Sequence, residues 1–124
     1  MTTLVRTAVM VLALSAIAVP AAQARDVEVF RSGPCTGASH WSLELDRETR
    51  IEADWEVHSV RAGQTWRVVM RHNGSVVWSG MRTTEHDGDF EVERTVTDAP
   101  GADAIRVRAV NNRTGEVSRG GASI

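Results

Sequence analysis

The chain has no lysine, no tyrosine and a single cysteine among its 124 residues. One cysteine excludes a disulfide within the chain. All 14 basic residues are arginines, and with 16 acidic residues they leave a net charge of −2, which gives no support to a polybasic nucleic-acid-binding tail. The length allows one folded domain. Composition therefore predicts an ordinary single domain, and no specific nucleic-acid binding is expected.

Long apolar runs are also scarce, and the longest lies near the N-terminus. Ala8–Val19 is a stretch of 12 residues, which as a helix spans roughly 18 Å and falls short of a hydrocarbon core of about 30 Å. Arg6 precedes it, and Ala22–Ala24 offers the small residues that signal peptidase accepts. Residues 1–24 are therefore predicted to be a signal peptide that is removed. Residues 25–124 then form a secreted domain, extracellular or in the cell envelope, without a membrane anchor.

Helical periodicity is absent from residues 25–124, where apolar and polar residues alternate instead. In Ile51–Val57 the odd positions are apolar and the even positions acidic, which is the pattern of a strand with one buried face. Strands are predicted at Val27–Phe30, Trp41–Leu45, Ile51–Val57, Thr65–His72, Ser75–Met81, Phe90–Val96, Ile105–Ala109 and around Val117.

Turn-forming residues separate the predicted strands. Asn73-Gly74 joins two apolar runs directly, and both residues tolerate the positive φ of a type I′ hairpin turn. Asp98–Gly101 and Asn111–Gly115 mark further turns, and Ser32–Ser39 is predicted to be a loop. About seven to eight antiparallel strands with regular turns predict an all-β, two-sheet sandwich of the immunoglobulin or fibronectin type III kind.

Three of the four tryptophans are predicted to lie in the core. Trp41, Trp55 and Trp66 share parity with the apolar residues of their strands, which favours burial over an exposed sugar-stacking platform. Trp78 lies in a run where both parities contain apolar residues. A place in the core and a place on a ligand-binding face therefore both stay open for Trp78.

Six short segments carry turn and core residues in a recognisable order: Cys35–Gly37, Trp41–Leu45, Arg50–Val57, Arg71–Gly74, Arg108–Val110 and Thr114–Val117. In this order the chain resembles a group of small exported actinobacterial β-sandwich proteins that is largely uncharacterised. The resemblance implies the fold and no activity. It also implies a second cysteine after the Gly-Glu-Val sequence, at the position that Ser118 holds here. This chain would then lack one half of the implied bridge.

The thiol of Cys35 is left without a partner in the chain. Cys35 lies eleven residues beyond the predicted cleavage site, whereas lipid attachment requires a cysteine directly after the signal. An unpaired cysteine in an exported protein is either an inert remnant or a route to a disulfide-linked dimer. Both interpretations stay open, and neither is catalytic.

No pattern typical of an enzyme or a metal site is found, and no cofactor is predicted. His40 follows Cys35 by five residues, but the two match no protease signature, so no catalytic residue is assigned. Glu85–Asp89 with Glu91 gathers carboxylates without the spacing of an EF-hand loop, and the histidines lack zinc-ligand spacing. The sequence therefore predicts a non-catalytic protein without a metal.

Charges are sorted between the two expected sheets. A fibronectin-like arrangement unites the strands of Trp41, Trp55 and Phe90 in one sheet. The outward positions of these strands are seven carboxylates: Glu44, Asp46, Glu52, Asp54, Glu56, Glu91 and Glu93. The other sheet holds the strands of Trp66, Trp78, Ile105 and Val117, and its outward positions include Arg67, Arg71, Arg106 and Arg108. We therefore expect one acidic face and one basic face.

Guanidinium groups suit bidentate contact with phosphate or carboxylate. The sequence thus predicts a small secreted protein that binds an anionic envelope or extracellular polymer. The expected ligand-binding residues are Arg67, Arg71, Arg106 and Arg108, joined by Trp78 if its ring lies beside them. Alternating charges also protect exposed strands from aggregation, which requires no ligand. The alternative function is that of a structural or accessory protein that engages another exported protein through a sheet edge.

Overall fold

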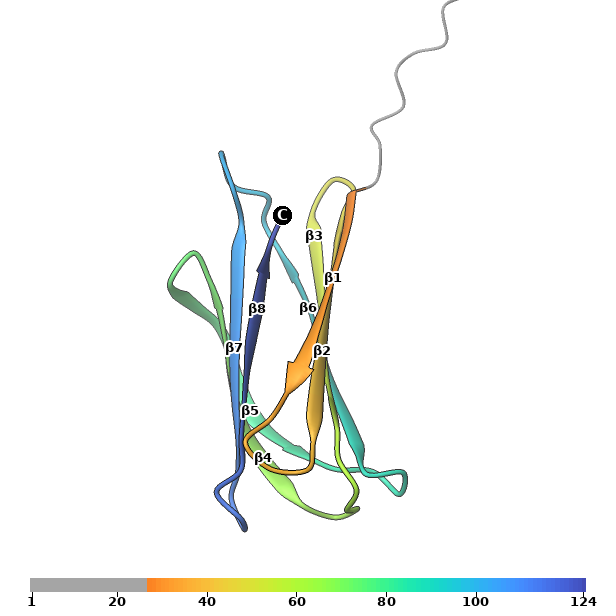
Figure 1. The fold of residues 1–124 in the computed structure, drawn as a ribbon. Helices are drawn as coiled ribbons and strands as arrows, with labels where there is room; N and C mark the ends of the chain where they lie inside the picture. Colours follow the sequence, from red (N-terminus) through yellow and green to blue (C-terminus); the bar gives the residue numbers. More distant parts are fainter. Residues whose placement is uncertain (1–26) are drawn as a thin grey trace, which may run out of the picture.

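Two four-stranded antiparallel sheets pack face to face in the computed structural model, which describes residues 27–124 (Figure 1). The strands are β1 (Val27–Pro34), β2 (His40–Arg47), β3 (Ile51–His58), β4 (Thr65–His72), β5 (Ser75–Thr83), β6 (Asp89–Val96), β7 (Ala104–Asn111) and β8 (Val117–Ser123). The all-β, two-sheet sandwich is confirmed, while its immunoglobulin or fibronectin type III kind stays a prediction. The predicted signal peptide, residues 1–24, lies outside the described residues.

The strands divide between the two sheets as predicted. Sheet A has the order β1-β2-β3-β6 and sheet B the order β5-β4-β7-β8, so the chain crosses between sheets after β3, β5 and β6. The predicted grouping of the strands of Trp41, Trp55 and Phe90 in one sheet is confirmed. Within residues 27–124, no helix is long and apolar enough to cross a membrane.

The predicted loop Ser32–Ser39 is wrong over its first three residues. Ser32, Gly33 and Pro34 continue β1 and pair with Ser42, Trp41 and His40 of β2. Pro34 is tolerated because β1 is an edge strand, where a missing backbone N–H costs no ladder bond to a second neighbour. The prediction failed because this segment has the composition of a turn, whereas its partner strand β2 decides its conformation.

The β4–β5 hairpin turn has the predicted geometry. Asn73 has φ 48° and Gly74 φ 87°, the two positive values that a type I′ turn requires. Asn73 also accepts a hydrogen bond at Oδ1 from the Ala104 N–H, at 2.8 Å. The turn is therefore tied to the start of β7, the strand that pairs with β4 on its other side.

The core lies between the sheets and contains the three predicted tryptophans. Trp55 and Trp66 are fully buried, Trp41 is 8% exposed, and the Trp41 and Trp55 rings stack at 5.0 Å between centroids. All 17 buried hydrophobic residues of the core lie between Trp41 and Ala122. A chain of residues 25–124 therefore contains all of the core found within the described residues 27–124.

Candidate functional site

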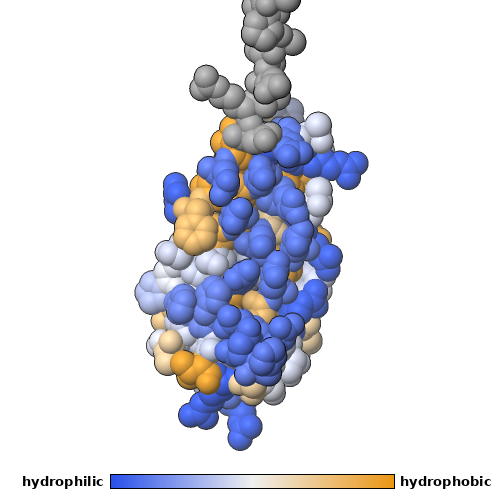
Figure 2. All heavy atoms as spheres, turned by 90° about the vertical axis from the view of Figure 1, so that its right-hand side faces the viewer, coloured by the Kyte–Doolittle hydropathy of each residue, from blue (hydrophilic) through white to orange (hydrophobic). Residues whose placement is uncertain are grey.

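The outer face of sheet A carries carboxylates from all four of its strands. We call it the acidic face and define it by Glu28, Glu44, Asp46, Glu52, Asp54, Glu56, Glu91 and Glu93. Five carboxylate pairs stand directly opposite each other across neighbouring strands: Glu28/Asp46, Glu44/Asp54, Asp46/Glu52, Asp54/Glu93 and Glu56/Glu91. Figure 2 views this side of the molecule, where hydrophilic side chains run along most of the surface.

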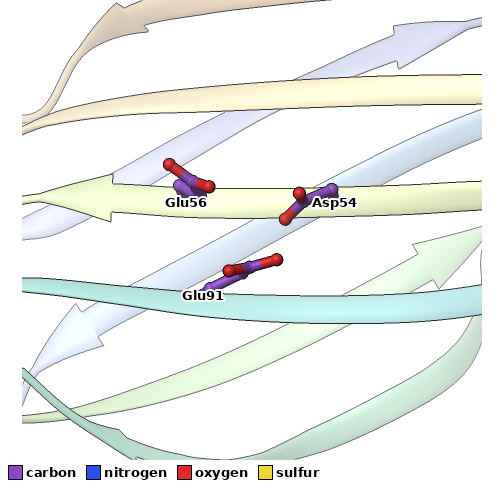
Figure 3. A group of neighbouring side chains, drawn as sticks. All are labelled: Asp54, Glu56 and Glu91. Atoms are coloured by element: carbon purple, nitrogen blue, oxygen red, sulfur yellow. The ribbon is translucent and has the colours of Figure 1, made fainter.

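Like charges directly opposite each other destabilise a sheet. The closest group is Asp54, Glu56 and Glu91, whose carboxylates each offer an oxygen within 4.8 Å of the others (Figure 3). Partial burial raises the pKa of Asp54 to about 7, with further rises from the hydrogen bond and charge of Glu91 and from the charges of Glu56 and Glu93. The Glu93 hydrogen bond and charge likewise raise the pKa of Glu52. The acidic face thus relieves part of its repulsion by sharing protons.

The same three carboxylates are the best candidates for cation ligands. Ca²⁺ takes about six to eight oxygen ligands, and this group supplies three side chains on an open sheet surface. Carboxylates gathered on a sheet surface do not by themselves define a metal site. The acidic segment Glu85–Asp89 forms a tight turn, in which the Gly88 N–H donates to the Glu85 carbonyl and the Asp89 N–H to the Asp87 carboxylate.

A Ser-His-Asp arrangement, which sequence spacing did not reveal, lies at one end of the acidic face. His58 Nδ1 is 3.0 Å from Asp89 Oδ2, and His58 Nε2 is 3.5 Å from Ser42 Oγ. However, Nε2 also faces the Glu56 carboxylate at 3.3 Å, so both ring nitrogens point at carboxylates and neither is reserved for the serine proton. Ser42 and His58 lie on interior strands whose backbone N–H groups belong to the ladder, which leaves no oxyanion hole there. The arrangement is not that of a nucleophilic site.

The outer face of sheet B carries arginines, whereas the acidic face carries carboxylates. We call it the basic face and define it by Arg67, Arg71, Arg106, Arg108 and Arg119. Arg71 stands directly opposite Arg106, and Arg108 directly opposite Arg119. Arg67 pairs with Val110, which lies two residues from Arg108 on the neighbouring strand. Arg67 is therefore the diagonal neighbour of Arg108. The structure thus brings the four predicted arginines together on the central strands β4 and β7, and adds Arg119.

Nothing on the basic face neutralises its charge. The four strands of sheet B contain no aspartate or glutamate, and within residues 27–124 none of the five arginines forms an ion pair. All five are exposed. The Arg106 side chain lies across Gly121, where a Cβ atom would be 2.5 Å from its Nη1. Five guanidinium groups are therefore presented to solvent without an ion-pair partner in the described part of the chain, although Arg106 Nη1 donates to the Ile105 carbonyl at 3.3 Å.

Trp78 does not join the basic face. It pairs with Met70, whose side chain is buried, and its own ring is partly buried against the core. The guanidinium carbons of Arg82 and Arg94 lie 4.5 and 4.9 Å from its ring centroid, one from β5 and one from β6. Trp78 thus closes the edge of the sandwich between β5 and β6. The sequence left this open because a bulge at Met70/Arg71 shifts the register of the strand pair.

Cys35 lies beside Ser118, the position where the resemblance implies a second cysteine. The Thr36 N–H donates to the Val117 carbonyl and the Val117 N–H to Thr36 Oγ1, each at 2.9 Å, which fixes the two segments side by side. Burial raises the pKa of the Cys35 thiol, a hydrogen bond with the Ser118 side chain opposes that rise, and the charge of Glu116 adds to it. The thiol is therefore held mostly in its unreactive protonated form at neutral pH.

A cleft of about 430 Å³ opens where three loops meet at one end of the sandwich. Its floor includes the buried amides of Gln64 and Asn111, which hydrogen-bond to each other at 2.7 Å. Asn111 Oδ1 also accepts from the backbone N–H groups of Arg113 and Thr114. These hydrogen bonds hold the loops together. We therefore do not assign the polar groups in the cleft to ligand binding.

Comparison of the chain with models of protein families, with curated proteins and with solved structures gave no match.

Proposed function

We propose that this protein is a small exported binding protein without catalytic activity, and that its basic face holds an anionic polymer of the cell envelope or the extracellular space. The observation that carries the proposal is the five-arginine face that has no carboxylate on its strands and no ion-pair partner within residues 27–124. Its export is part of the proposal, since it depends on the predicted signal peptide at residues 1–24.

The cost of this face supports a role for it. Two arginine pairs stand directly opposite each other, although like charges in such positions weaken a sheet. An edge strand needs a charge to prevent aggregation, but Arg67, Arg71, Arg106 and Arg108 lie on the two central strands. Protection of an edge therefore does not account for them, whereas an anionic partner would convert the repulsion into attraction.

The spacing of the arginines suits an extended ligand. Neighbouring strands are about 4.8 Å apart, and alternate residues along one strand are about 6.7 Å apart, so the five guanidinium groups form a two-dimensional array. Each group can contact a phosphate, sulfate or carboxylate with two parallel N–H donors. Repeated anionic groups of one polymer would thus bind several arginines at once.

Binding to inorganic polyphosphate and to a sulfated polysaccharide tests this function. A chain of residues 25–124 is expected to bind at low salt, and Arg67→Glu with Arg106→Glu to reduce the affinity at least tenfold. Raising the ionic strength from about 0.01 M to about 1 M shortens the Debye length from about 30 Å to about 3 Å and is expected to release the polymer.

Arg31→Glu with Arg50→Glu is the matched control, because it changes the net charge equally on exposed arginines of β1 and the β2–β3 turn. This control is expected to bind nearly as well as the unchanged chain. Equal loss in both double variants would show that net charge, and not the basic face, attracts the polymer. Absence of any polyanion binding at low salt would refute the proposed function.

The edge strand β5 supports the second candidate, engagement of another exported protein. Val76, Val77 and Met81 on this strand are 54%, 39% and 45% exposed. Exposed apolar residues on an open edge suit the addition of a partner strand. This function would be favoured if the unchanged chain captures one protein at high salt and the Val76→Lys variant does not. A lysine on an edge strand opposes the addition of a partner strand.

A further inference from the structure

We propose that a second copy of this chain is an occupant of the basic face, and that it docks there through its own acidic face. The sandwich then stacks head to tail, with sheet A of one copy against sheet B of the next. This proposal rests on the basic face being an anion-binding surface, as proposed above. It adds that self-stacking and polymer binding compete for the same five arginines.

Charge complementarity is the first argument. The acidic face holds eight carboxylates and its outward positions include no arginine, while the strands of the basic face hold no carboxylate. Arg94 of sheet A is not an exception, because it has the same inward parity as Phe90 and Val92 and its guanidinium lies over the Trp78 ring. Each face is therefore a surface of one sign that lacks counter-charges and matches the other.

The two faces also share one geometry. Both are four-stranded antiparallel sheets with strands of seven to nine residues, so their side chains project with similar spacing, apart from the register shift at Met70/Arg71 in sheet B. A lattice of carboxylates can thus meet a lattice of guanidinium groups with many contacts in register. A flexible polymer lacks this preformed match and must lose conformational freedom to acquire it. The geometry therefore favours a folded acidic partner of the same shape.

The position of the two faces decides the type of assembly. They lie on opposite sides of one sandwich, which consists of the two sheets in Figure 1. A copy that binds a neighbour through its acidic face therefore keeps its basic face open to a further copy. Such an interface joins two different surfaces and is open-ended, in contrast to a self-complementary dimer interface. The expected products are dimers, trimers and longer rows in proportion to concentration.

The size of the faces makes each contact weak. A sheet of four strands of this length measures roughly 26 Å by 19 Å, so two faces bury on the order of 1,000 Å² in total. This is the lower limit for a specific interface, and the contact is mainly between charged groups, with apolar surface from Phe30, Val76 and Met81. Stacking is therefore expected to be reversible and steeply salt-dependent.

Sedimentation of residues 25–124 over a concentration series is the first test. At an ionic strength of about 0.01 M the average mass is expected to rise with concentration, and at about 1 M it is expected to stay that of a monomer. Two variants divide the interface. One neutralises the acidic face with Glu44→Gln, Glu91→Gln and Glu93→Gln, and the other neutralises the basic face with Arg67→Gln, Arg71→Gln and Arg108→Gln. Each variant alone is expected to remain monomeric.

Mixing the two variants gives the decisive result. The acidic-face variant keeps an intact basic face and the basic-face variant keeps an intact acidic face, so the mixture is expected to form dimers of one copy of each and nothing longer. A dimer also proves that both variants are folded. A mixture that stays monomeric would overturn the proposal, and so would association of the unchanged chain that salt does not reverse.

Polyphosphate separates this proposal from the proposed function. The acidic-face variant is expected to bind polyphosphate at least as tightly as the unchanged chain, because the competing copy is removed. Polyphosphate is also expected to dissolve the rows of the unchanged chain. A chain that binds polyphosphate and never self-associates would refute stacking and leave the proposed function standing. A chain that self-associates and ignores polyphosphate would refute the proposed function and the competition.

Discussion

At the scale of single residues, large aromatic rings close the two open sides of the sandwich and glycines leave room for one of them. Trp41 lies against Gly33 of β1 and Gly120 of β8, where added Cβ atoms would come within 3.0 and 2.4 Å of its ring atoms. On the other side, Trp78 lies between Arg82 and Arg94. Rings at both open sides shield the core between the sheets from water.

Gly120→Ala is expected to destabilise the protein. Its Cβ would lie 2.4 Å from Trp41 Cζ2, and the Trp41 ring has little freedom because it stacks on Trp55. Overpacking of this kind costs about 1–3 kcal/mol, so thermal unfolding is expected several degrees lower. Ser123→Ala is the control, since it changes an exposed residue of the same strand. Equal melting temperatures for both variants would show that the ring moves away freely.

Ser118→Cys is expected to form a disulfide with Cys35. The hydrogen bonds between Thr36 and Val117 place the two positions as neighbours on adjacent segments. In the chain-entropy model a bridge that closes a loop of about 80 residues stabilises a protein by roughly 4–5 kcal/mol. Loss of both free thiols and a melting temperature that falls on reduction would verify the bridge. Ser118→Ala, which gives no bridge, separates this effect from a change in packing.

At the scale of elements, each sheet tolerates like charges on its outer face because its inner face is well packed. On sheet A this repulsion contributes to a shifted pKa at Asp54. Burial, the hydrogen bond with Glu91 and the charges of the neighbouring carboxylates together raise the pKa of Asp54 to about 7. Since the unfolded chain has no such neighbours, folding binds a proton at Asp54 in the range between its ordinary and its raised pKa.

The contribution of Asp54 to the stability of the unchanged chain is therefore expected to fall as pH rises. A group whose folded pKa is raised stabilises the fold fully below its unfolded pKa and loses that contribution as pH rises through its folded pKa, which for Asp54 is the range from 3.8 to about 7. Asp54→Asn is expected to raise the melting temperature at about pH 8 and to flatten its pH dependence. Glu85→Gln, an exposed acid outside the acidic face, is expected to change neither. Melting curves at both ends of this range provide the measurement.

At the scale of the whole molecule, the sandwich carries negative charge on one side and positive charge on the other, although the net charge of the chain is only −2. Repulsion acts between cross-strand neighbours about 5 Å apart, whereas attraction between the faces acts across the whole sandwich, over a distance of roughly 20 Å. Because the Coulomb energy falls with distance, each cross-strand repulsion is about four times stronger than an attraction across the sandwich, and we expect repulsion within each face to be the dominant electrostatic contribution.

Moderate salt is consequently expected to stabilise the isolated sandwich. In dilute protein the melting temperature should rise between ionic strengths of about 0.01 M and about 0.15 M, because the Debye length falls from about 30 Å to about 8 Å. In concentrated protein, stacking adds stability at the low-salt end by mass action. Salt dependence of opposite sign at the two protein concentrations would support both effects. A melting temperature independent of salt in dilute protein would show that repulsion within the faces is negligible.

The strands, the buried tryptophans and the sign of each outward residue can all be predicted from the order of the amino acids. These properties follow from alternation with a period of two and from turn residues, which act between neighbours in the chain. The division of strands between sheets was also predicted, from the strand order of a fibronectin-like sandwich, and the strands of Ile51–Val57 and Thr65–His72 do lie in different sheets.

Which of these residues contact one another follows from the three-dimensional arrangement of the strands. It brought Glu28 and Arg119 into the two faces, placed Trp78 at an edge instead of beside the arginines, and joined Ser42, His58 and Asp89 from three strands. Each of these outcomes depends on register between strands, and in Trp78 on a bulge. Register is set by contacts between residues far apart in the chain, so no local pattern of side chains contains it.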